Sequence, residues 1–184
     1  MSERNTVLRS LHDVGLATWF GGALMGAVGL NGATGQANEP SERLRLSSLG
    51  WKLWSPVVAG AIAAHGVGGL GLIAANRRRV DQDSGTRVNT YSKAGLTIAA
   101  AGLTLYAGVL GRKVESGAPE GADGATTPGE STPHEVAAAQ RQLKVIQLAI
   151  PVLTGVVVVL GAQQGEQQRP TQQLVGRLTR GLNL

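Results

Sequence analysis

The sequence predicts an all-α fold: a polytopic membrane protein whose four transmembrane helices form one bundle domain over residues 1–184. The first observation is a set of four apolar blocks that contain no Asp, Glu, Lys or Arg, at residues 14–31, 56–75, 94–111 and 145–162. Each block is about long enough to cross a hydrocarbon core of roughly 30 Å at ~1.5 Å per helical residue. The second observation is that no block has the charged face typical of soluble amphipathic helices. Together they predict burial in lipid.

The distribution of basic residues predicts the orientation, because cytoplasmic flanks of membrane helices are enriched in Lys and Arg. The densest run is Arg77, Arg78 and Arg79, directly after the second block, and these arginines are also expected to anchor that end of the span in the membrane interface. With four spans, both termini lie on the same side as this run, and that side has more Lys and Arg in total, although Arg112 and Lys113 favour the opposite orientation. We therefore expect both termini in the cytoplasm, with residues 163–184 as a basic cytoplasmic tail.

Charge and composition narrow the classes of partner and compartment. The net charge of +5 follows from the basic flanks, and the few aromatic residues do not favour base stacking, so no nucleic-acid partner is predicted. The absence of cysteine excludes disulfides and thiolate metal sites. A composition rich in Gly, Ala, Val and Arg and poor in Lys indicates a bacterium, and hence the bacterial inner (plasma) membrane.

The connections between the blocks differ in character. Residues 38–55 mix leucines and charges with Trp51 and Trp54, which predicts a short segment lying in the outer membrane interface, anchored by the two tryptophans. This segment is expected to end where Pro56 starts the second span. Residues 113–140 include a stretch rich in Gly, Pro, Ser, Thr and acidic residues without an apolar pattern. They predict a mobile outer loop.

Small residues four apart predict close helix packing, because helices in lipid associate through backbone proximity and van der Waals contact. The expected helix-packing residues of the first two spans are Gly22, Gly26, Gly29, Gly60, Ala64 and Gly68. These faces serve packing among the four spans, or association with a partner subunit or a second copy of the chain. Pro151 is expected to kink the fourth span.

Three residues are candidate ligands for a metal or haem. His65 is the only ionisable residue well inside a predicted span, and it is read either as a structural histidine bonded to a neighbouring carbonyl, as a haem or copper ligand, or as a proton relay. Counting residues from the predicted span ends places His65 about 15 Å deep and His12 at the membrane boundary, too far apart to share one iron. Met25 falls about 16 Å deep, which permits a His65–Met25 axial pair.

The start of the first span resembles two families of bacterial membrane proteins. Leu11 and His12, then Trp19, then Gly21 and Gly22 are similar to the "LH…WLGG" opening of copper-resistance protein D-like proteins. The same residues resemble the "LH…TWFAG" opening of small haem-dependent protoporphyrinogen oxidases. The resemblance covers residues 11–22 and implies a haem-binding role for His12. After Gly22 the chain departs from the oxidase pattern, because "ALMGAVGLNGA" replaces the expected bulky and basic residues.

The sequence favours a non-catalytic membrane protein over an enzyme. The four blocks lack Asp, Glu, Lys and Arg, and the chain shows no nucleophile–base spacing, phosphate-binding loop or paired-carboxylate motif. The predicted function is that of an accessory or structural subunit of a larger membrane complex, in contact with the lipid bilayer and without a cofactor. The alternative is a haem b- or copper-handling membrane protein that uses His65.

Overall fold

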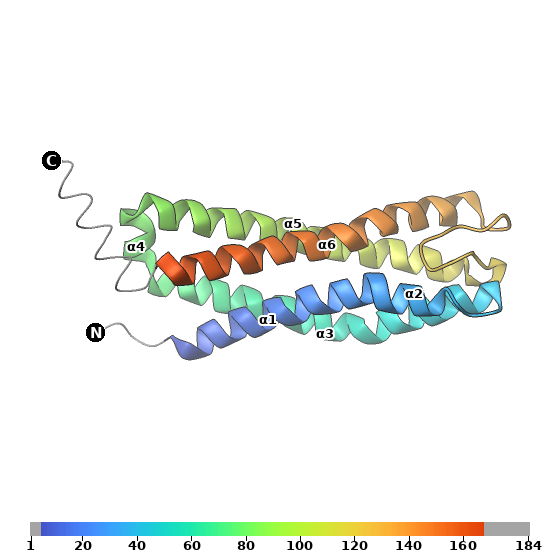
Figure 1. The fold of residues 1–184 in the computed structure, drawn as a ribbon, viewed down its shortest axis with the longest axis horizontal. Coiled ribbons are helices and arrows are strands. Elements are labelled where there is room, and N and C mark those ends of the chain that lie inside the picture. The colour runs from blue at the N-terminus through green and yellow to red at the C-terminus, as the bar shows by residue number, and fades with distance from the viewer. Residues whose placement is uncertain (1–4, 168–184) are drawn as a thin grey trace.

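Four long helices run along one axis in alternating directions (Figure 1). The computed structural model describes residues 5–167. In chain order the elements are α1 (Thr6–Met25), a π-helical turn (Gly26–Leu30), α2 (Asn31–Thr34), α3 (Pro40–Ala75), α4 (Arg77–Gln82), α5 (Ser84–Ser116), a 3-10 turn (Ala118–Glu120) and α6 (His134–Gln167). The start of α1, the end of α6 and α4 lie at one end of the bundle, and α2 lies at the other.

The predicted all-α bundle of four long apolar helices is confirmed. Four helical segments are long and apolar enough to cross a membrane: Thr6–Thr34, Pro40–Ala75, Ser84–Ser116 and His134–Gly165. Each is longer than the roughly 20 residues that a bilayer core requires. The uncharged blocks found in the sequence therefore lie within these helices, and each helix extends beyond its block at one end or at both.

Local signals explain where two of the helices begin. Pro40 occupies the first turn of α3, where its missing N–H removes no helical hydrogen bond. Asp83 is the N-cap of α5, and its carboxylate accepts hydrogen bonds from the Gly85 backbone N–H at 3.1 Å and the Thr86 hydroxyl at 2.8 Å. Such a cap satisfies donors that the first helical turn leaves free.

The helices pack as two close pairs, α1 with α3 and α5 with α6, joined mainly by α1 against α6. A cluster of buried residues holds the middle of the bundle together: Trp19, Ala23, Ala61, Ala100 and Ile150. A second cluster lies nearer the α2 end: Leu44, Leu110, Val114, Ala122, Ala139 and Leu143. The contact between α3 and α5 is much less extensive than that within either pair. A cavity lies between α3 and α5.

The predicted interfacial segment before the second span is wrong. Residues 40–55 belong to the single helix α3, and Pro56 lies inside that helix rather than at its start. Leu44 is fully buried and Ser47 is buried, so this part of α3 packs on the bundle. The charged residues that indicated an interface, Arg45 and Lys52, lie on the exposed side of the same helix.

The connection between α5 and α6 folds back onto the bundle. The expectation that residues 113–140 bury too little apolar surface to become ordered is therefore wrong. Ala122 and Ala125 are buried, and the fully buried Gln140 donates from Nε2 to the Gly124 carbonyl at 2.9 Å. Arg43 of α3 donates to the carbonyls of Ala122 and Asp123. Backbone carbonyls, which a composition-based reading ignores, supply these contacts.

Gly121 turns the chain where this connection meets the start of α3. Its φ of +75° is in the region that favours glycine, and a Cβ atom there would lie 2.8 Å from Cβ of Pro40. The predicted basic tail, residues 163–184, falls mostly outside the described residues, of which Gln167 is the last.

Candidate functional site

The backbones of α1 and α3 come close together where the two helices cross. A Cβ atom on Gly15 would lie 2.6 Å from the Ala61 carbonyl oxygen and 2.6 Å from the His65 backbone nitrogen. A Cβ atom on Gly68 would lie 2.5 Å from both the His12 nitrogen and the Leu8 oxygen. These contacts are to backbone atoms, which side-chain rotation cannot relieve. Glycine at both positions therefore sets the distance between the two helices.

The close crossing buries His65 between three helices. Its Nδ1 atom lies 2.9 Å from the His12 carbonyl oxygen, and its Nε2 atom lies 3.3 Å from the Thr97 hydroxyl of α5. A carbonyl oxygen only accepts, so Nδ1 is the donor and Nε2 is left to accept from Thr97. His65 is 3% exposed, and both ring nitrogens have partners. The arrangement matches the structural histidine anticipated among the alternatives.

The predicted separation of His12 from His65 is wrong. The centroids of the two rings lie 4.2 Å apart, and the His12 ring also faces Asp13, whose carboxylate oxygen lies 2.9 Å from Nδ1. The error came from taking the membrane boundary as the start of the helix. α1 begins at Thr6, so His12 lies well inside it, at the level where α3 carries His65 and Gly68.

The predicted pairing of Met25 with His65 is also wrong. Gly22 of α1 lies against Trp54, and Gly26 lies against Trp51. Met25 is thus level with the first half of α3, about 15 Å along α1 from Gly15, which touches His65. Its side chain is 64% exposed.

The candidate ligands His12 and His65 contact each other and neighbouring protein groups. Their ring centroids lie 4.2 Å apart, and Nε2 of His65 faces the Thr97 hydroxyl. Within residues 5–167 no three His, Cys, Asp or Glu side chains are grouped so that they could hold a metal. His134, the third histidine, is exposed at the start of α6, at the opposite end of the bundle.

The structure divides the predicted packing residues into two groups. Gly22, Gly26 and Gly68 lie in the contact between α1 and α3. Gly60 has open space where a Cβ would be, Gly29 faces only Met25 of its own helix, and Ala64 lines a shallow groove between α1 and α3. Gly15, Gly50 and Gly71, which the spacing argument did not select, also face side chains or backbone of the partner helix.

The predicted interfacial anchors lie partly inside the bundle. Trp51 and Trp54 are half-buried over the glycines of α1, and the Trp51 indole donates to Asn31 Oδ1 at 3.0 Å rather than to water. The three arginines form the exposed start of α4: Arg77, Arg78 and Arg79.

Asn31 is the centre of a polar network that sequence reasoning missed. Its Oδ1 accepts from the Ser47 hydroxyl at 3.2 Å as well as from Trp51, and its Nδ2 donates to Gln147 Oε1 at 2.7 Å. The network joins α2, α3 and α6, and the π-helical turn directly precedes Asn31. The available signal was the presence of amide side chains within two uncharged blocks, since such groups need partners in lipid.

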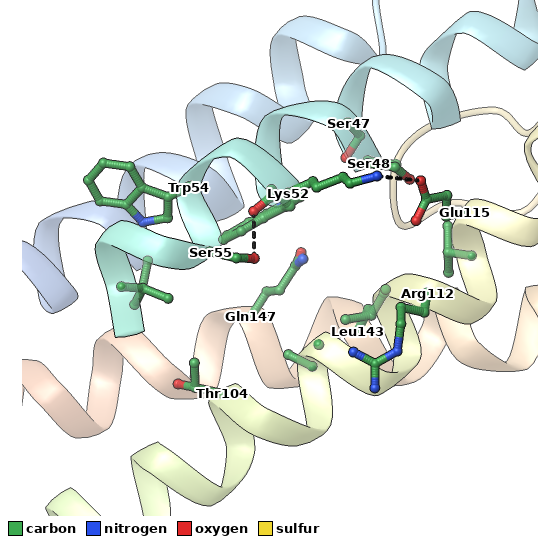
Figure 2. A pocket seen from close by; sticks show the side chains of 18 of the residues that line it. Ser47, Ser48, Lys52, Trp54, Ser55, Thr104, Arg112, Glu115, Leu143 and Gln147 are labelled. Atoms are coloured by element: carbon green, nitrogen blue, oxygen red, sulfur yellow. Dashed lines mark hydrogen bonds and ion pairs between the residues drawn. The ribbon is translucent and has the colours of Figure 1, made fainter. Parts of the chain in front are cut away.

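Ser47, Trp51 and Gln147 form part of the wall of a cavity between α3 and α5, here called the α3–α5 slot (Figure 2). Its volume is about 410 Å³. At the middle of the bundle it is lined by Trp19 and Thr104, which are joined by a 3.2 Å hydrogen bond from the indole N–H. Towards the α2 end its lining includes three charged residues, Lys52, Arg112 and Glu115.

Comparison with family models, curated proteins and solved structures finds no match. The described part of the chain offers a buried histidine with both nitrogens occupied, an interhelical amide network, and an elongated slot with charges at one end.

Proposed function

We propose that this multi-pass membrane protein is a non-catalytic accessory subunit that associates with other membrane helices, or with a second copy of itself, through the outer face of α5. The supporting observation is a row of small exposed residues on that helix, Gly95, Ala99 and Gly102. Both glycines have open space where a Cβ atom would be. The neighbouring Ile98 and Leu105 are 73% and 75% exposed.

A row of this kind forms a shallow groove with apolar walls, into which another helix can pack closely. The bundle itself leaves α5 the least covered of its four helices, with 11% of its most apolar window buried. Lipid chains can cover such a surface, but the combination of small residues with protruding apolar side chains favours a helix over disordered lipid. The proposed location is the bacterial inner membrane, with both termini in the cytoplasm.

The proposal of a non-catalytic role is supported by the surroundings of the buried histidine. Among residues 5–167 the only buried titratable side chain is His65, and its ring is held by His12 and Thr97. An acid–base site needs a titratable group within reach of a substrate. The haem- or copper-handling alternative is not favoured by any contact of His65.

The test is purification in mild detergent with co-purifying chains retained, for the full-length chain and for Gly102→Phe. Gly102→Phe places a ring in the groove and is expected to release the partner, or to convert an oligomer to a monomer in sedimentation analysis. The matched control is Gly108→Phe, another open glycine of α5, about 120° around the helix from Gly102. Equal assembly in both variants, or a wild-type chain that sediments alone as a monomer, would refute the proposal.

A further inference from the structure

The α3–α5 slot has one charged end and one weakly polar end. Thr104, near the middle of the uncharged block of α5, and Glu115, near the end of that helix, both line the slot. Eleven residues separate them, which corresponds to about 16 Å along a helix. Half of a hydrocarbon core measures roughly 15 Å. The slot thus extends over about the depth of one membrane leaflet.

The charged end carries an excess of positive charge. Lys52 Nζ of α3 lies 4.0 Å from Glu115 Oε1 of α5, across the mouth of the slot (Figure 2). Both side chains are more than half exposed. Arg112 also lines the slot, and within residues 5–167 it makes no ion pair. Two cations and one carboxylate therefore leave a net charge of about +1 at this end, available to an anion.

Small residues of α5 form one wall of the deeper part of the slot. Ala107, Gly108 and Gly111 of α5 all line it, and the positions of a Cβ on the two glycines are open. Val58 and Ile150 complete an apolar interior. The exposed Gly108 shows that the slot opens at the bundle surface, where the hydrocarbon of the bilayer lies. A flexible chain can enter from that side.

We propose that the α3–α5 slot binds one membrane phospholipid with an anionic head group. The phosphate lies at Arg112 and Lys52, and one acyl chain extends past Gly108 towards Trp19. A phospholipid matches both ends of the slot. Its charged head group would lie at the charged end, and its acyl chain would lie along the apolar residues deeper in the membrane. The volume of about 410 Å³ falls within the range typical of small-molecule sites.

The experiment is native mass spectrometry of the full-length chain in detergent, titrated with phosphatidylglycerol or with phosphatidylcholine of the same acyl composition. We expect one tightly bound phosphatidylglycerol per chain, held about tenfold more tightly than phosphatidylcholine. Arg112→Gln is expected to weaken phosphatidylglycerol binding more than phosphatidylcholine binding, and so to remove most of this preference. Glu115→Gln is expected to strengthen phosphatidylglycerol binding, since it removes the only slot-lining carboxylate.

The acyl-chain part of the proposal has its own test. Gly108→Phe fills the slot and is expected to abolish tight binding of both lipids, whereas Gly60→Phe, at an open position of α3 outside the slot lining, leaves it unchanged. Equal affinity for the two lipids, or an unchanged preference in Arg112→Gln, would overturn the assignment of the anionic head group. Displacement of the lipid by inorganic phosphate alone would show a simple anion site and would overturn the role of the acyl chain.

Discussion

Replacing Gly68 by alanine tests whether the α1–α3 crossing sets the stability of the bundle. The added Cβ would lie 2.5 Å from the His12 backbone nitrogen and 2.5 Å from the Leu8 carbonyl oxygen. An ordinary contact begins at about 3.5 Å, so α1 and α3 must separate locally by about 1 Å. Neither backbone atom can move away without moving its helix.

The cost of Gly68→Ala has two parts. Overpacking of a close contact typically costs about 1–3 kcal/mol. A displacement of about 1 Å would also stretch the 2.9 Å contact between His65 Nδ1 and the His12 carbonyl beyond hydrogen-bond range, at a cost of about 0.6–1.5 kcal/mol. Alanine recovers up to about 1 kcal/mol through its higher helix propensity. The net expected loss of unfolding free energy is about 1–3 kcal/mol.

Unfolding in mixed micelles, followed by circular dichroism as the fraction of denaturing detergent rises, measures this free energy. Gly60→Ala in the same helix is the matched control, because its Cβ would enter open space. It is expected to unfold at the same detergent fraction as the wild-type chain or slightly higher. If Gly68→Ala is as stable as Gly60→Ala, the close crossing of α1 and α3 does not limit stability and the reasoning fails.

Two further predictions concern a buried side chain and the α5–α6 connection. His65→Ala removes both hydrogen bonds of the ring and leaves a cavity, so it is expected to lower the unfolding free energy by about 2–4 kcal/mol. The visible spectrum and the metal content of the purified protein are expected to stay unchanged. Loss of a Soret band or of bound copper in this variant would contradict the structural role. Gln140→Leu removes the amide that holds the carbonyls of Gly124 and Ala125, and is expected to speed cleavage after Glu130 by a glutamate-specific protease about fivefold or more. Unchanged cleavage would show that other contacts hold the connection in place.

The sequence predicted the apolar part of each of the four helices well and the full extent of the helices poorly. A long block without charge has only one stable form in lipid, because every backbone polar group must be satisfied within the segment. Helix ends follow weaker signals. Residues 40–55 of α3 carry charges that a hydropathy reading assigns to the interface, although Leu44 and Ser47 are buried at helical spacing between them.

The candidate sites were predictable only in part. His65 stood out as an ionisable residue inside an apolar block, and its burial followed from the glycines around it. The contact between His65 and His12 was not predicted. Depths counted from the membrane boundary instead of from the start of the helix placed the two residues too far apart. Asn31 and Gln147 were visible as amides within two blocks, but nothing in either local sequence indicates that they meet.

The sequence alone was enough to predict four helices long and apolar enough to cross a membrane, since block length and the lack of a charged face are local properties. Only the tertiary structure decided how the helices are rotated and shifted along one another. The Gly15 and Gly68 contacts set the register of α1 on α3, and that register stacks His12 on His65. The same packing leaves α3 and α5 apart, so that Lys52, Arg112 and Glu115 converge on one slot. Such positions depend on how side chains of different helices interlock, which no single segment encodes.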